Sequence, residues 1–400
     1  MTVEEIEKVL SGEKRKVTVF YKRKDSQNIG DFCEDTDNLR TSHDRIGDTL
    51  VWIRGLSIPP YTVCLLKEII AIKDGQLDTH PSLQFGSDPE LFYEINGVMV
   101  PSTQVIINDT ELVTKDGFQV ELHPHKTHCR QLGASFIGRC LKEASLLGKM
   151  VGAKLSFKLA YRVDDKVWKK TNKATKMFGC HPTENAQEKN PKRVTGLREK
   201  FRAGGGHIHL GGLTEKEKRN LPTIIKIMDI VVGNTLVLLD RDKANITRRK
   251  NYGRAGEYRP KPYGLEYRVP SNFWLKHYVL WSLASGQMRN AIAYYRLGLT
   301  DELFKRFDMR DIRNAINNND YDLALNNFMK YTEFLRDVNI PMNSAISVHN
   351  VDKFLSWIKE KNPLQKLGKL TDSSIIAHWV PGGFTGREGF ELFINRIKVK

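Results

Sequence analysis

From residue 84 onward, the chain alternates between short stretches of period-two apolar spacing, which predict strands, and longer stretches of helical spacing. The clearest strand pair covers 91–95 and 98–100, and Asn96-Gly97 between them is typical of a hairpin with a type I′ turn. Further strands are predicted at 118–122, 154–163, 207–210 and 264–269. Because polar and apolar residues alternate in them, we expect an antiparallel sheet with one solvated face.

Apolar residues at helical spacing predict a helix over 131–150. Thr214-Glu215-Lys216-Glu217 fits a capping box and opens a helix that reaches about residue 240, with a kink or restart at Pro222. Other helices are predicted at 272–295, 320–337 and 351–360. The basic segment 167–203, which contains proline and glycine, predicts a long loop. The fold class is therefore α+β.

With 400 residues, the chain is long for one simple domain. A polar loop around 74–82 indicates a boundary. We expect an N-terminal accessory segment at 1–80, a catalytic core at 81–300 and a mainly helical part at 301–400.

The net charge of +16 calls for an anionic ligand: nucleotide phosphates, nucleic acid or an acidic substrate. It is concentrated at 162–202, with twelve Lys/Arg against five acids, and at 240–268, with nine against four. A merely solvated basic surface is equally compatible with the first stretch.

Five scattered cysteines, with no CxxC pair, are typical of free thiols in a reducing compartment. The chain has no apolar run of transmembrane length, and its acidic start lacks a secretion-signal pattern. We therefore expect a cytoplasmic protein without a membrane partner. The oligomeric state is left open.

Four segments place two charged or metal-competent residues two positions apart, so that in a strand both share one face. They are Asp88-Pro89-Glu90, Glu121-Leu122-His123, His207-Ile208-His209 and Glu266-Tyr267-Arg268. Such a face is costly to bury without partners, and divalent cations and phosphates are the natural ones.

The first two segments are weak evidence when taken alone. Asp88 and Glu90 suit a hard divalent ion, but Asp-Pro is also a common turn initiator. Glu121 and His123 could equally lie on an exposed strand face.

Glycines flank His207 and His209 on both sides, which lets a ligand approach the backbone closely. Two imidazoles on one strand face can bind metal or contact phosphate, and they are improbable as core packing.

Glu266 can hold a cation while the guanidinium of Arg268 clamps a phosphoryl oxygen. Further phosphate contacts are open to Arg248, Arg254 and Arg259, although a surface salt-bridge ladder is the alternative. The sequence has no P-loop, no strand-linked GxGxxG, no GxSxG and no HExxH motif.

The motif order GSDPE, DGxxxE, GGHIHLG, RxGEYR and GLEYRVPS, over about residues 84–275, resembles a phage family. This family is the carboxylate–amine ligases of type two, in the glutamine synthetase and glutamate–cysteine ligase superfamily. The resemblance implies a curved antiparallel sheet forming a funnel, with ATP entering one end, substrates the other, and Mg²⁺ or Mn²⁺ between them.

Carried over motif by motif, the resemblance implies that Asp88, Glu90, Glu121 and Glu266 are metal ligands. It implies that His207 supports metal or ATP phosphates, with His209 in the same motif, and that Arg268 stabilises the transferred phosphoryl group. Arg254 and Arg259 would contact phosphate or substrate. Asp88 departs from the superfamily's usual glutamate, and its shorter arm could make it a water-mediated ligand.

The implied activity is amide-bond formation between a carboxylate and an amine, through an acyl phosphate. Both substrates could be small molecules or groups carried on a macromolecule. Two alternatives stay open at this point: a phosphotransferase on the same fold, and a basic nucleic-acid-binding protein.

Overall fold

The computed structural model describes residues 83–127, 130–177, 183–188, 200–338, 345–379 and 390–399. The expected accessory segment 1–80 lies outside these residues. The expected division at residue 300 stays a prediction. Among the described residues, no helix is long and apolar enough to cross a membrane.

The described strands form two five-stranded antiparallel sheets and a two-stranded ribbon. The first sheet has the order β1 (Gln84–Ser87), β10 (Ile208–Gly211), β12 (Gly264–Tyr267), β11 (Glu257–Lys261) and β8 (Glu184–Asn185). The second contains β3 (Val98–Val100), β2 (Glu90–Ile95), β5 (Gln119–Leu122), β4 (Val113–Asp116) and β6 (Lys154–Ser156). The ribbon pairs β7 (Ala160–Arg162) with β9 (Phe201–Ala203).

The first sheet carries apolar side chains on one face and charged ones on the other, and the charged face is largely buried rather than solvated as expected. Leu210, Leu265 and Tyr267 alternate with the polar residues of β10 and β12, and all three are completely buried. The hydroxyl of Tyr267 donates to Asp229 Oδ1 at 2.7 Å, which ties this sheet face to the helical layer. Period-two alternation therefore sorts apolar and charged side chains onto opposite faces.

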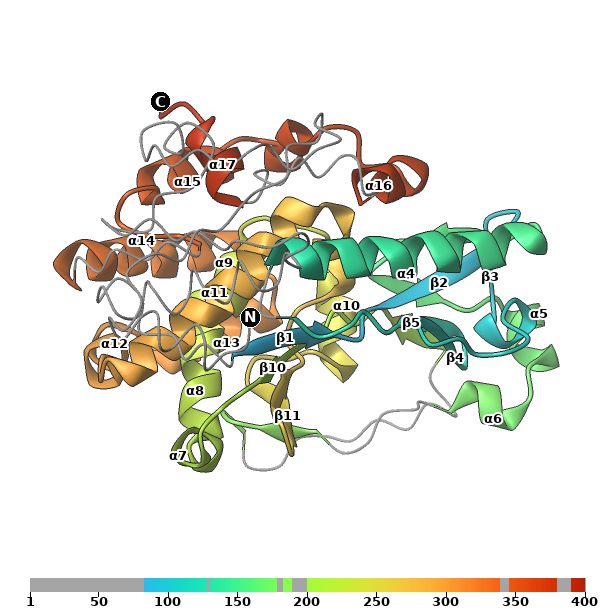
Figure 1. The fold of residues 1–400 in the computed structure, drawn as a ribbon, viewed down its shortest axis with the longest axis horizontal. Coiled ribbons are helices and arrows are strands. Elements are labelled where there is room, and N and C mark those ends of the chain that lie inside the picture. The colour runs from blue at the N-terminus through green and yellow to red at the C-terminus, as the bar shows by residue number, and fades with distance from the viewer. Residues whose placement is uncertain are drawn as a thin grey trace, which may run out of the picture. The chain divides into compact units, whose positions relative to one another are not determined.

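The hairpin of the second sheet confirms the expected turn. Asn96 and Gly97 both have positive φ, at 52° and 78°, as a type I′ turn requires. The long helix α4 (Arg130–Met150) runs along β2 and β5 in Figure 1. Its inward residues, among them Cys140, are buried in the main core.

Along the chain, the helices other than α4 that come before β12 are η1 (Ser102–Gln104), α5 (Asp165–Lys170), α6 (Lys173–Lys176), α7 (Glu215–Arg219), α8 (Leu221–Met228), η2 (Asp229–Gly233), α9 (Asn234–Val237) and α10 (Ala244–Asn251). After β12 follow η3 (Asn272–Lys276), α11 (Tyr278–Arg296), α12 (Thr300–Arg306), α13 (Met309–Asn317), α14 (Tyr321–Val338), α15 (Val351–Ile358), η4 (Pro363–Leu367), α16 (Asp372–His378) and α17 (Phe390–Asn395). In Figure 1, α5 and α6 lie beside the second sheet, whereas α8, α9, α11 and the helices after it lie at the other end and in the C-terminal part.

The α+β class is confirmed, with antiparallel sheets of which one curls into a half-barrel. The capping box at Thr214 and Glu217 is present, and the helix restarts near Pro222, as expected. Two expectations were wrong. Residues 154–163 form two short strands in different sheets, and the described part of 167–203 contains two helices and two strands.

Candidate active site

The charged face of the first sheet carries two cross-strand rows. His209 faces Glu266, which faces Arg259, so these three residues form one row across β10, β12 and β11. His207 lies one residue before β10 and Arg268 one residue after β12, each two positions from its partner in the row, so both side chains belong to the same face. The predicted sharing of a face by His207 with His209, and by Glu266 with Arg268, follows from this register.

Asp88 joins this face from the connection between β1 and β2. Its two carboxylate oxygens contact different imidazoles: Oδ1 lies 3.1 Å from His207 Nδ1, and Oδ2 lies 3.1 Å from His209 Nε2. The antiparallel pairing of β1 with β10 brings these residues together, because Ser87 faces Ile208 in the register. Two motifs that are 119 residues apart in the sequence thus meet at one point.

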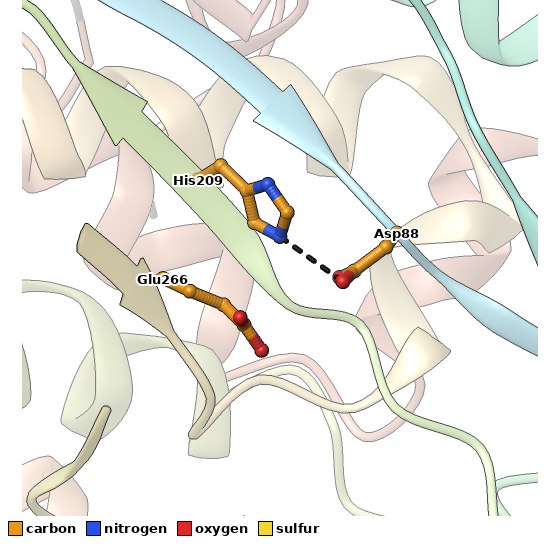
Figure 2. A group of neighbouring side chains, drawn as sticks. All are labelled: Asp88, His209 and Glu266. Carbon is orange, nitrogen blue, oxygen red and sulfur yellow. Dashed lines mark ion pairs between the residues drawn. The ribbon is translucent and has the colours of Figure 1, made fainter. Parts of the chain in front are cut away.

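Asp88, His209 and Glu266 form a group that could hold a metal ion (Figure 2). One potential ligand atom from each lies within 4.8 Å of the others. Figure 2 shows the three side chains converging from β10, β12 and the end of β1. Two carboxylates and one imidazole form a donor set that suits Mg²⁺ or Mn²⁺.

Glu266 is the most heavily paired carboxylate of the face. Its Oε1 lies 2.7 Å from Arg268 Nη1 and 3.3 Å from His207 Nδ1. Its Oε2 lies 3.0 Å from Arg259 Nη1 and 3.3 Å from Lys261 Nζ. Burial favours the neutral acid, but the adjacent imidazole of His207 and the guanidinium of Arg268 keep the pKa of Glu266 below its ordinary value.

Tyr252, which sequence reasoning missed, connects two of the predicted catalytic residues. Arg268 Nη2 donates to the Tyr252 hydroxyl at 3.2 Å, and this hydroxyl also contacts His207 Nε2. These contacts favour the neutral tautomer of His207 in which the proton is on Nδ1, which faces Asp88 Oδ1 at 3.1 Å, and Nε2 accepts from Tyr252. Burial, together with the charge of Arg268, lowers the pKa of His207 and supports the neutral form.

His209 differs from His207 in its charge preference. Burial disfavours its protonation, but the carboxylate of Asp88 outweighs this and raises the pKa of His209. Conversely, burial opposes the ionisation of Asp88, while His209 and His207 hold the pKa of Asp88 well below its usual range. A second tyrosine that the sequence did not indicate, Tyr263, contacts His209 Nδ1 through its hydroxyl at 3.0 Å.

The glycine loop before β10 is where the two sheets meet. The backbone N–H of Gly205 donates to Glu90 Oε2 at 2.7 Å, and Glu90 N–H donates to the Gly205 carbonyl at 2.8 Å. A Cβ on Gly205 would lie 2.8 Å from Glu90 Oε2, 2.8 Å from His207 Nε2 and 3.0 Å from the Tyr252 hydroxyl. Only a glycine leaves room for these three functional groups.

Glu90 and Glu121 face each other in neighbouring strands β2 and β5, outside the group of Asp88, His209 and Glu266. Burial and the nearby Asp116 raise the pKa of Glu90 to about 7. Burial, with Asp88 and Glu90 close by, raises the pKa of Glu121 to about 9. These shifts show that the predicted carboxylates form one electrostatically coupled acidic region, and their role as metal ligands stays a prediction.

The two other arginines predicted to contact phosphate, Arg254 and Arg248, make their contacts with residues other than Glu266. Arg254 pairs with Glu257 at 3.2 Å and with Glu188 at 3.6 Å. Arg248 is buried and donates to the carbonyls of Val269 and Pro270 at 3.0 and 2.7 Å. Arg248 thus supports the strand end after Arg268, whereas Arg259 lies in the cross-strand row with Glu266.

The fold and the site define an α+β protein with a charged sheet face that carries a group of side chains able to hold a metal ion. A model of the family described as phage phiEco32-like COOH.NH2 ligase, type 2, matches residues 184–322. The family resemblance inferred from the motifs is therefore confirmed over this segment, and the family's name indicates a carboxylate–amine ligase. The matched segment contains His207, Glu266 and Arg268, whereas Asp88 precedes it. No curated protein matches the chain.

Proposed function

We propose that the protein is an ATP-dependent ligase that joins a carboxylate to an amine through an acyl phosphate. The observation that carries this proposal is the convergence of Asp88, His209 and Glu266 beside Arg268 and Arg259 on one sheet face. Acidic groups next to fixed guanidinium groups are what a metal-bound triphosphate requires. The family match favours a ligase over other uses of such a site.

The residues present fit Mg²⁺ or Mn²⁺. Asp88 Oδ1 and His209 Nε2 are buried atoms with close ionic neighbours but no hydrogen bond of normal geometry, so they have unused capacity for coordination. We assign Asp88, His209 and Glu266 as the first candidates to hold the ion, with Glu90 and Glu121 as further acidic groups. A bound divalent ion would offset the charge of the phosphate oxygens during transfer.

The proposed reaction has two steps. A carboxylate oxygen of the substrate attacks the γ-phosphorus of ATP, the bond to the β–γ bridging oxygen breaks, and ADP leaves. The amine nitrogen then attacks the acyl carbon, the carbon–oxygen bond to phosphate breaks, and phosphate and a proton are released. The first step brings two anions together, so the barrier depends on positive groups positioned in advance.

Arg268 and Arg259 would stabilise the negative charge of the transferred phosphoryl group in different ways. Arg268 is 1% exposed and fixed by Glu266 and Tyr252, so we propose that it supplies an immobile positive charge. The side chain of Arg259 is 17% exposed, and we propose that it turns from Glu266 to a phosphoryl oxygen when nucleotide binds. His207 would keep Asp88 oriented through its Nδ1–H.

Hydroxylamine provides a test that does not need the natural amine, because it converts any acyl phosphate into a hydroxamate. The protein is incubated with ATP, MgCl₂ and hydroxylamine, together with pools of amino acids and dicarboxylates or a small-molecule extract of host cells. Hydroxamate and ADP should appear in equal amounts and only when carboxylate, ATP and Mg²⁺ are all present. EDTA should stop the reaction.

Variants then connect the activity with the site. Asp88→Asn and Arg259→Gln should each abolish most hydroxamate formation, whereas the exposed Arg310→Gln should not change it. ADP release without hydroxamate, with a stable phosphorylated product, would instead identify a phosphotransferase. Hydroxamate formation that survives both site variants would remove this sheet face from the mechanism.

A further inference from the structure

A small basic module lies beside the second sheet and is not used by the proposed chemistry. It consists of residues 160–177 and 200–203, which form β7, α5, α6 and β9 (Figure 1). Its packing is separate from the main core: Phe92, Met99, Phe118 and Val163 form their own buried cluster, with Trp168 against it. The module is therefore packed on the second sheet through this small apolar cluster.

The module has eight basic side chains and two acidic ones. Both acids are already engaged within it. Asp165 pairs with Lys200 at 2.8 Å, and Asp164 caps α5 by accepting from the backbone N–H of Lys166 and Val167. Consequently, little negative charge inside the module is left to offset its other lysines.

Four lysines of the module are exposed and have no ion pair or side-chain hydrogen bond within the part of the chain that the structure describes: Lys166, Lys169, Lys170 and Lys173. Lys166, Lys169 and Lys170 are three and four positions apart in α5, so they are neighbours on the helix surface. Like charges at this spacing destabilise a helix, and a polyanionic ligand would relieve the repulsion.

The aromatic residues of the module, Tyr161, Trp168 and Phe201, are half-buried, and each ring is already in contact with another side chain. Trp168 is stacked on Phe118 with ring centroids 6.0 Å apart, and it lies 5.1 Å from Arg202 and 5.0 Å from Lys176. Among the module's described residues, Met177 is the only large apolar side chain that is exposed. A protein partner normally needs aromatic or apolar anchors, and single-stranded nucleic acid normally needs free rings.

We propose that this lysine surface binds the phosphate backbone of duplex nucleic acid, without sequence preference. Unpaired lysines on an exposed helix face without free aromatic rings suit phosphate contacts, which supply non-specific affinity. The proposal does not depend on the ligase activity, because no residue of the lysine surface belongs to the candidate active site.

The module is nevertheless continuous with that site. The strand β9 leads directly into the glycine loop, and Gln119 Nε2 donates to the carbonyl of Ala203 at 3.0 Å and to Glu90 Oε2 at 3.3 Å. A nucleic acid held by α5 would therefore lie on the same structural unit that positions Glu90. If the ligase acts on a group carried by nucleic acid, this surface would concentrate its substrate.

The test uses the full chain and a fluorescein-labelled 20-base-pair DNA duplex, with anisotropy titrations between about 50 and 300 mM NaCl. The triple variant Lys166→Gln/Lys169→Gln/Lys170→Gln should bind at least about tenfold more weakly near 100 mM salt. A plot of the logarithm of its association constant against the logarithm of the salt concentration should fall less steeply than that of the wild type, by about two to three in the slope. The matched control Lys305→Gln/Lys359→Gln/Lys361→Gln loses the same charge from other exposed sites and should retain wild-type binding.

The charge-keeping variant Lys166→Arg/Lys169→Arg/Lys170→Arg should bind like the wild type, and an unchanged thermal unfolding curve of the glutamine variant excludes a folding defect. Three results would overturn the proposal: no duplex binding by the wild type, equal weakening by the control variant, or competition by polyglutamate as effective as that by unlabelled duplex. The last result would assign the surface to an acidic polypeptide. Failure of the hydroxamate assay would leave this binding result unaffected.

Discussion

Replacing Glu266 by glutamine removes one negative charge from the centre of the site while keeping the side-chain volume. Glu266 is completely buried, and so is its partner Arg268, whose Nη1 lies 2.7 Å away. The amide can accept a hydrogen bond through one atom only, and its NH₂ group must face a cation. The variant therefore leaves a buried guanidinium without its counter-charge.

The expected cost comes mainly from Arg268. The side chains of Arg259 and Lys261 are 17% and 26% exposed, so both can turn toward solvent when their partner is lost. Breaking a buried ion pair by removing one partner costs about 3–5 kcal/mol. For a folded unit of roughly this length, the unfolding entropy converts that loss into a decrease in Tm of about 5–8 °C.

Thermal unfolding followed by circular dichroism measures this effect. The control is Glu215→Gln, because Glu215 is 76% exposed and pairs with Lys218 on the surface, and we expect its Tm to change by less than about 1 °C. Adding Arg268→Gln to Glu266→Gln should restore part of the lost stability. The reasoning would be refuted if Glu266→Gln had the same Tm as the wild type. It would also be refuted if the double variant lost as much Tm as the sum of the two single variants.

Three further predictions concern the surroundings of this network. Gly205→Ala should lower hydroxamate formation by about 100-fold with little change in Tm, because the added methyl group meets only the ends of side chains in the site. Gly206→Ala should instead unfold the protein, because its methyl group would collide with the backbone of Ser271. Equal losses of stability in the two variants would contradict this contrast. Tyr252→Phe should reduce the rate and lower stability by about 1–3 kcal/mol, since a buried acceptor on His207 loses its donor, and urea unfolding measures the second effect. Burial, with His378 nearby, lowers the pKa of the helix cap His277 to about 3, so His277 should contribute a loss of about 1 kcal/mol of stability between pH 7.5 and 5.5, because the unfolded chain takes up a proton that the folded one excludes. The buried acids Glu90 and Glu121, whose pKa values are raised to about 7 and about 9, act in the opposite direction over this range, so the test compares the wild type with His277→Asn, which keeps the cap. In urea titrations the wild type should lose about 1 kcal/mol relative to the variant on acidification, and the same pH dependence in both proteins would exclude His277 as a contributor.

Local periodicity was sufficient to predict several parts of the site. Side chains two apart on a strand share a face whatever the tertiary structure, so the relation between His207 and His209 followed from the sequence. The turn at Asn96-Gly97 was equally local, because positive φ angles restrict the residues that fit.

What the sequence could not supply was the cross-strand register. Asp88 contacts both histidines only because β1 pairs with β10, and no local pattern encodes that pairing. Tyr252 follows α10 and gives no periodic signal, so its link between His207 and Arg268 became visible only in the fold. The helix α5 was missed because its polar, basic composition resembles that of a loop.

The pairing around Glu266 also bears on the order in which ligands bind. A metal ion alone must compete with Arg259 and Lys261 for the oxygens of Glu266, and a phosphate alone must draw those cations away from a buried carboxylate. When both arrive, the metal takes the carboxylate and the phosphate takes the cations, so no buried charge is left alone. We therefore expect positive coupling: calorimetric titration should show Mn²⁺ binding at least about tenfold more tightly in the presence of a non-hydrolysable ATP analogue, after correction for binding in solution, and the analogue should bind more tightly by the same factor with Mn²⁺. Independent affinities would mean that Arg259 and Lys261 do not exchange partners, and the proposed movement of Arg259 toward phosphate would then be wrong.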